Sequence, residues 1–224
     1  MGSVAQNLAQ LQAQIQAAAS GRPVTLLAVS KTKPLPLLLE AFAAGQTQFG
    51  ENRVQEALEK KPQMPAGAEF HLIGPLQKNK AKACPGLFGW VHSLERLDVA
   101  QLLSQKAQEK GVRIKVLVQL NLSLEDSKSG ITRFDQLAPF CESLLDLPGL
   151  ELKGLMTIGH PNLDEGGNKK IFAQLRELLE KTRSTLGLQA QMDQLSMGMS
   201  WDWRWALEEG ATILRIGSAI FGGR

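Results

Sequence analysis

The chain has 224 residues, of which 43% are hydrophobic, and its 25 basic and 22 acidic side chains leave a net charge of +3. This length and apolar content suffice for one sizeable core, and the near balance of charge gives no electrostatic case for binding nucleic acid. No apolar run is long enough to span a bilayer, and the first residues lack the charged and apolar segments of a signal peptide.

The predicted elements begin with an amphipathic helix and continue as an alternation of strands and helices. In the segment 3–19, Leu8, Leu11 and Ile15 recur at helical spacing, and Ser20-Gly21 with Pro23 ends the pattern. Short apolar runs predict strands at 25–29, 47–49, 70–73, 89–92, 114–120, 152–157, 194–197 and 212–216. Helical patterns follow the first seven of them, at 35–44, 53–60, 79–84, 96–111, 134–145, 168–186 and 201–209.

This alternation predicts an α/β fold with parallel strands, because each parallel connection needs a crossover element such as a helix. Eight repeats indicate a single (β/α)8 TIM-type barrel with an extra N-terminal helix, although such barrels usually have about 250 residues. An open doubly wound sheet is the alternative that periodicity leaves open. No linker or composition shift divides the chain, so we expect one domain over residues 1–224. In a barrel, functional residues lie where the strands end.

The first predicted strand ends in Ser30-Lys31, shortly before Pro34 prevents its continuation. A lysine at this position has two interpretations. It is either a surface side chain whose stem covers apolar groups, or an amine held at the mouth of a site. The other strand ends decide between the two.

The loops after the last two predicted strands carry glycine and serine. In the segment 196–200, SMGMS, we expect Ser200 to cap the following helix and Asp202 to lie in its first turn. A glycine-containing loop before a helix also binds anions through free N–H groups. Gly217-Ser218 follows the last strand directly, and barrels frequently bind phosphate with these two loops.

Lys31 faces this phosphate corner in a closed barrel, because the first and last strands are neighbours there. An amine opposite an anion site suits pyridoxal 5'-phosphate (PLP), which needs a Schiff-base lysine and a phosphate cradle. Arg215, at the end of the last strand, is placed to donate to the ring nitrogen and keep it unprotonated. A surface salt bridge from Arg215 to Glu208 or Glu209 is the alternative. A phosphosugar barrel with a Schiff-base lysine, as in aldolases, also stays open.

Four motifs carry a resemblance that spans essentially the whole chain: AVSKTKP, FGENRVQE, FHLIGPLQKNK and LSMGMSWDWRWALEEGATILRIGSAIFG. They resemble the YggS/PROSC family of PLP-binding, PLP homeostasis proteins, whose fold is similar to the N-terminal domain of bacterial alanine racemase. Ser218 stands where many members have threonine, so the hydroxyl is kept. The resemblance implies a Schiff base on Lys31, a phosphate site at Ser200, Gly217 and Ser218, a ring-nitrogen partner in Arg215, and Asn52 near the cofactor.

The residue inventory argues against efficient racemisation. Racemases of the alanine type use a tyrosine from a second domain of a partner subunit as the second base, and this chain has no tyrosine and no residues left for such a domain. The other candidate bases, His71, His92, His160 and Cys84, are more typical of structural positions. We therefore expect a protein of intracellular PLP homeostasis and amino-acid metabolism that holds PLP on Lys31 without robust turnover. A PLP-dependent amino-acid racemase of narrow scope is the alternative.

The expected partners follow from this interpretation: PLP itself and PLP-dependent apoenzymes, with neither nucleic acid nor membrane. No obvious apolar stripe is present, so we expect a monomer. Cys84 and Cys141 lie far apart and in no CxxC pattern, which is typical of buried, reduced thiols in a cytoplasmic protein. Three tryptophans at 201, 203 and 205 either pack the outer helix or form a surface patch. A patch would support a third reading, a regulatory protein for which PLP is a signal.

Overall fold

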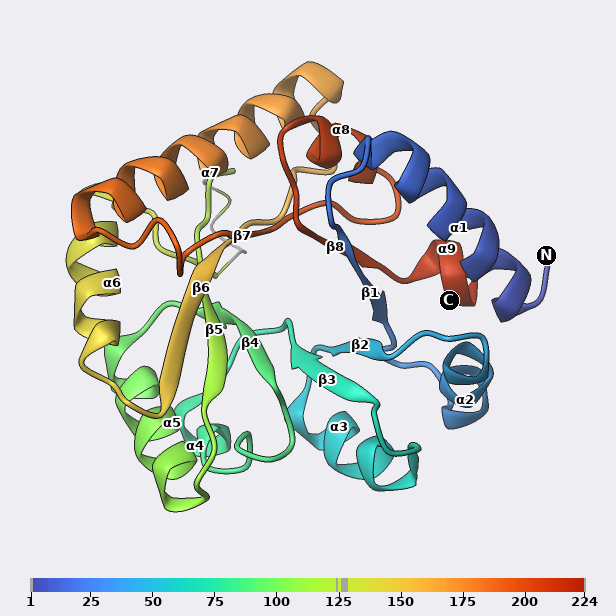
Figure 1. Cartoon of the computed structure of the whole chain (residues 1–224), viewed down its shortest axis with the longest axis horizontal. Helices are drawn as coiled ribbons and strands as arrows, with labels where there is room; N and C mark the ends of the chain where they lie inside the picture. The colour runs from blue at the N-terminus through green and yellow to red at the C-terminus, as the bar shows by residue number, and fades with distance from the viewer. Residues whose placement is uncertain (1, 124, 126–128, 224) are drawn as a thin grey trace.

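The computed structural model describes residues 2–123, 125 and 129–223. Within these ranges eight strands form a closed barrel in which each strand pairs in parallel with the next and β8 pairs with β1 (Figure 1). The predicted barrel is therefore confirmed, and the open doubly wound sheet is wrong. Residues 1 and 224 of the expected domain, and 124 and 126–128 of the loop after β5, lie outside the described residues. The strands are β1 (Thr25–Val29), β2 (Gln48–Glu51), β3 (Glu69–Leu72), β4 (Trp90–Leu94), β5 (Ile114–Gln119), β6 (Leu150–Met156), β7 (Gln194–Ser196) and β8 (Ile213–Ile216).

Helices surround the barrel and fill the predicted crossover positions (Figure 1). A short helix after β8, α9, was not predicted from the sequence. Among the described residues, none of the helices combines the length and the apolarity that crossing a bilayer would need. The helices are α1 (Val4–Ala19), α2 (Leu35–Ala43), α3 (Val54–Lys60), α4 (Lys78–Ala81), α5 (Leu97–Glu109), α6 (Leu137–Leu145), α7 (Glu165–Leu186), α8 (Trp203–Glu208) and α9 (Ser218–Phe221).

The extra helix α1 is set by its caps and by its apolar face. Ser3 and Gln6 form a capping box at its start, and Ser20 adopts a left-handed conformation at its end. Leu8, Leu11 and other apolar residues at helical spacing are buried. This helix packs against α2, α8 and α9, so the first and last helices lie side by side (Figure 1).

Two apolar clusters hold the barrel together. The larger lies between the strands and the surrounding helices, and the smaller lies inside the barrel around Leu27, Leu117, Met156 and Ile213. Polar side chains also point into the core, and several of them are fully buried. The barrel interior is thus only partly apolar, and this places buried polar groups beneath the functional end of the strands.

The capping prediction for Ser200 is wrong. Helix α8 begins only at Trp203, and its N-cap is Asp202. The Asp202 carboxylate accepts from the N–H of Met199 at 2.5 Å and stabilises a turn before the helix. Because this turn occupies the residues that the helix would need, Ser200 stays outside it. The Ser200 hydroxyl instead accepts from the N–H of Gly217 at 3.3 Å.

Candidate functional site

A cavity of about 300 Å³ opens at the carboxyl ends of the strands, within the size range of small-molecule sites. The structure brings every residue predicted for the site to this cavity. Apolar side chains, among them Val29, Ile73 and Ile158, line the rest of it. A second depression, which shares Lys31, Lys33 and Asn52 with the cavity, adjoins it on this side. The predicted residues that line it are Lys31, Asn52, Ser200, Arg215, Gly217 and Ser218.

The turn after β1 brings both lysines of the motif, Lys31 and Lys33, to the cavity. The N–H of Lys33 donates to the carbonyl of Ser30 at 3.1 Å, and Thr32 adopts a left-handed conformation with φ of 60°. The Lys33 ammonium is bound to the carbonyl oxygens of Gly222 and Gly223, each at 2.9 Å. Lys33 therefore fastens the end of the chain to the turn, and both lysines line the cavity.

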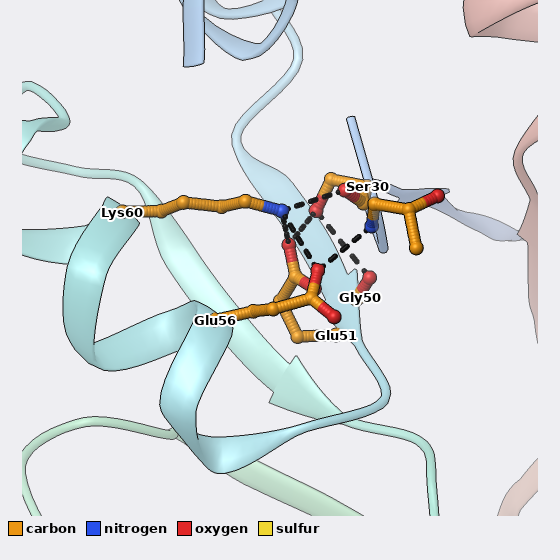
Figure 2. Close-up of polar contacts among 6 residues, drawn as sticks. Ser30, Gly50, Glu51, Glu56 and Lys60 are labelled. Carbon is orange, nitrogen blue, oxygen red and sulfur yellow. Dashed lines mark hydrogen bonds and ion pairs between the residues drawn. The ribbon is translucent and has the colours of Figure 1, made fainter. Parts of the chain in front are cut away.

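A cluster of three charged side chains grips the backbone on both sides of Lys31. We call Glu51, Glu56 and Lys60 the lysine clamp. Figure 2 shows the Lys60 ammonium, which reaches from α3 and donates to the Ser30 carbonyl at 2.9 Å, to Glu51 at 2.8 Å and to Glu56 at 3.2 Å. Ser30 donates its hydroxyl to Glu51 at 2.7 Å, and the Thr32 N–H donates to Glu56 at 2.7 Å.

The two carboxylates of the clamp differ in environment. Glu51 is fully buried, and burial raises its pKa against the opposing effect of Lys60 and Ser30. Burial alone would also raise the pKa of Glu56, but hydrogen bonds from Thr32 and Lys60 outweigh it and lower that pKa. Sequence reasoning missed the clamp. Its only sequence signal was the i, i+4 spacing of Glu56 and Lys60 on one helix.

Arg215 lies at the floor of the cavity and is 4% exposed. Its guanidinium donates to the Ser196 hydroxyl at 2.7 Å and to the carbonyl of Thr157 at 2.8 Å. Burial lowers its pKa to about 10, so it keeps its charge at neutral pH. The alternative of a surface salt bridge is wrong, because Glu208 and Glu209 pair with other cations.

The loops after β7 and β8 meet in one corner of the cavity. The hydrogen bond from Gly217 to Ser200 ties them together, and Ser218 starts α9, whose first N–H groups have no acceptor within the helix. A Cβ on Gly217 would lie 3.0 Å from the carbonyl oxygen of Val29, so glycine allows this turn to lie against β1.

The donor set of the cavity fits an anionic ligand that also carries an aldehyde. Lys31, Lys33 and Arg215 supply positive charge, and the serines supply hydroxyl donors. None of the described residues that line the cavity is acidic. A lysine amine, a corner with serine hydroxyls and helix N–H groups, and a guanidinium in one cavity are the groups that PLP would require.

The other candidate bases do not line the cavity. His71 and His92 are buried in the barrel interior, and burial lowers the pKa of both rings. Burial raises the pKa of Cys84 to about 12. His160 is paired with Glu125 at 2.6 Å. These environments support the structural interpretation of all four residues.

The tryptophans divide between the two interpretations. Trp203 is buried and packs α8 against the barrel, whereas Trp201 is 42% exposed and also lines the cavity. The Trp201 ring meets Trp205 edge to face at 5.7 Å. Only part of this segment therefore faces solvent, so it gives little support to a partner surface.

Comparison with known proteins agrees with this geometry. The family described as "Alanine racemase, N-terminal domain" matches residues 2–224. A protein of Pseudomonas aeruginosa named pyridoxal phosphate homeostasis protein is 45% identical, over 100% of this chain and 97% of that relative.

Solved structures extend the likeness to three dimensions. PipY of Synechococcus elongatus PCC7942, solved with PLP bound, is 35% identical with a TM-score of 0.87, over 98% of this chain and 100% of that chain. The alanine racemase of Bacillus anthracis shares the fold, with a TM-score of 0.74 at 18% identity, over 99% of this chain and 56% of that chain. The chain belongs to the family of pyridoxal phosphate homeostasis proteins, whose barrel is that of the N-terminal domain of alanine racemase.

Proposed function

We propose that this protein binds PLP as a Schiff base on Lys31 and serves intracellular PLP homeostasis without robust catalytic turnover. The observation that carries the proposal is one cavity that combines the Lys31 amine, the Ser200–Gly217 corner and the buried Arg215. The PLP-bound structure of PipY supports the same cofactor.

Each predicted residue has a role in this proposal. Bound PLP supplies an aldehyde that joins an amine reversibly. Lys31 provides the amine, and the lysine clamp holds the backbone beside it. Ser200, Gly217 and Ser218 would bind the phosphate, Arg215 would donate to the ring nitrogen, and Asn52 would lie beside the ring.

Holding and releasing PLP fits the site better than racemisation does. A second base is needed on the far face of the substrate, yet the chain has no tyrosine, and none of its histidines is among the described residues that line the cavity. The open mouth beside Lys31 allows exchange of the cofactor. We extend the proposal to a cytoplasmic monomer that delivers PLP to apoenzymes. An amino-acid racemase of narrow scope stays the second candidate.

Borohydride reduction of the protein with PLP, followed by peptide mapping, tests the proposal. We expect a pyridoxyl label on Lys31, its loss in Lys31→Ala with the fold intact, and its retention in the matched control Lys33→Ala. A label spread over surface lysines such as Lys78 and Lys82 would refute PLP binding at this site. Formation of D-amino acids that depends on Lys31 would favour the racemase.

A further inference from the structure

A column of polar side chains crosses the barrel interior below the cavity. We call Gln48, His71, His92 and Ser196 the histidine chain, and it ends on Arg215. His71 Nε2 lies 2.5 Å from Gln48 Oε1, and His71 Nδ1 lies 2.9 Å from His92 Nε2. His92 Nδ1 lies 2.9 Å from the Ser196 hydroxyl, which accepts from Arg215 at 2.7 Å. None of these four residues has a role in the proposed function.

The two ends of the histidine chain fix the direction of its hydrogen bonds. Arg215 can only donate, and the amide oxygen of Gln48 can only accept. The Glu69 carboxylate, another acceptor, lies 3.8 Å from the same ring nitrogen of His71. The contact with His71 lowers the pKa of Glu69 to about 2 against the opposing effect of burial, so this group is ionised at neutral pH.

Only one arrangement of protons satisfies every contact when both rings are neutral. His71 donates from Nε2 to Gln48, so its Nδ1 must accept from His92 Nε2. The Nδ1 of His92 is then bare and accepts the Ser196 hydroxyl hydrogen. The Ser196 lone pairs are left for Arg215. Every hydrogen bond in the column therefore points away from the cavity.

The surroundings of the rings keep them neutral. His71 is 1% exposed and is faced by Glu69 on β3, Lys115 on β5 and His92 on β4, and it stacks on Trp90. His92 is fully buried, with His71 on one side and Arg215 on β8 beyond Ser196. The positive charge of Arg215 disfavours a second charge on His92.

We propose that Ser196, His92 and His71 are positioning residues for Arg215, acting through a one-directional hydrogen-bond chain. Because the Ser196 hydrogen is committed to His92, its lone pairs stay turned to the guanidinium. Together with the Thr157 carbonyl they fix two of its nitrogens. The remaining donors of Arg215 are thereby aimed into the cavity. That these donors meet the ring nitrogen of PLP rests on the proposed function.

The direction of the hydrogen bonds in the histidine chain is tested without cofactor, by ¹⁵N NMR of the imidazole nitrogens at neutral pH. The protein has three histidines, so the imidazole signals are few, and His160 serves as a reference outside the histidine chain. We expect His71 and His92 to carry their proton on Nε2 with Nδ1 bare. A proton on His92 Nδ1, or a doubly protonated ring, would overturn the proposal.

The positioning role is tested by Ser196→Ala in the PLP-loaded protein. We expect the PLP dissociation constant to rise about three- to tenfold, as for the loss of one typical hydrogen bond, and the absorption of the bound cofactor to shift. The control is Ser104→Ala, a buried serine that accepts from Gly149 away from the cavity and should leave both unchanged. Wild-type affinity and absorption in Ser196→Ala would overturn the role.

A second variant keeps the inference testable should Ser196→Ala fail to fold. His71→Phe removes the acceptor of the His92 Nε2 proton and leaves both contacts of Arg215 in place. We expect the His92 proton to move to Nδ1. Unchanged His92 signals would refute the proposal that His71 fixes the proton of His92. If the wild-type protein binds no PLP, the proposed function fails, while the NMR experiment still tests the direction of the hydrogen bonds in the histidine chain.

Discussion

Replacing Lys60 with methionine tests the lysine clamp. Lys60 donates to the Ser30 carbonyl at 2.9 Å, to Glu51 at 2.8 Å and to Glu56 at 3.2 Å, and its side chain is 12% exposed. Removing one member of a buried ion pair costs about 3–5 kcal/mol. Because burial already raises the pKa of Glu51, that carboxylate can take up a proton, which limits the cost. We expect Lys60→Met to lower the free energy of unfolding by about 3 kcal/mol, the lower end of that range.

Denaturant unfolding measures this loss, and a double-mutant cycle assigns it. Neutralising the partner in Lys60→Met/Glu51→Gln should restore about 1–2 kcal/mol, because no buried charge is then left unpaired. Lys106→Met, which breaks a surface pair with Glu109, should leave stability nearly unchanged. A loss below about 1 kcal/mol in Lys60→Met, or additive effects in the cycle, would refute the clamp.

Charge, steric overlap and burial each give one further prediction. The pKa of Glu69 is lowered to about 2, so its ionised form stabilises the fold at pH values above 4.5. This stabilisation is lost as the pH falls from 4.5 toward 2. In acid unfolding, Glu69→Gln should therefore lose less stability over this pH range than the wild type. A Cβ on Gly154 would lie 1.9 Å from a backbone oxygen of β7, so Gly154→Ala should lower the unfolding free energy by about 3 kcal/mol or more, or prevent folding. The control Gly166→Ala, on the open side of α7, should have no such effect. Equal thermal melting temperatures of the two variants would contradict this prediction. Cys84 and Cys141 are buried, and burial raises the pKa of both thiols to about 12. A thiol reagent should therefore label neither cysteine in the native protein and both after denaturation. Fast labelling of the native protein would show that these two side chains are not buried.

The order of strands and helices was predictable because it depends on local patterns. Apolar runs of strand length, helical periodicity and prolines at turns are all properties of neighbouring residues. The first strand, 25–29, was predicted with the bounds that the structure has. The position of Lys31 at its end follows from the same pattern. The capping prediction for Ser200 failed because a side chain two residues later, Asp202, stabilises a competing turn.

The barrel order and the placement of the site residues at strand ends can be read from the amino-acid sequence, because both depend on short-range spacing. Which buried polar groups meet depends instead on how the strands are arranged in three dimensions. His71 and His92 come from the neighbouring strands β3 and β4, whereas Ser196 and Arg215 come from β7 and β8. Neither β3 nor β4 pairs with β7 or β8 in the barrel. Closure of the barrel points all four side chains into one interior, where burial makes each hydrogen bond obligatory. No spacing along the chain encodes that contact.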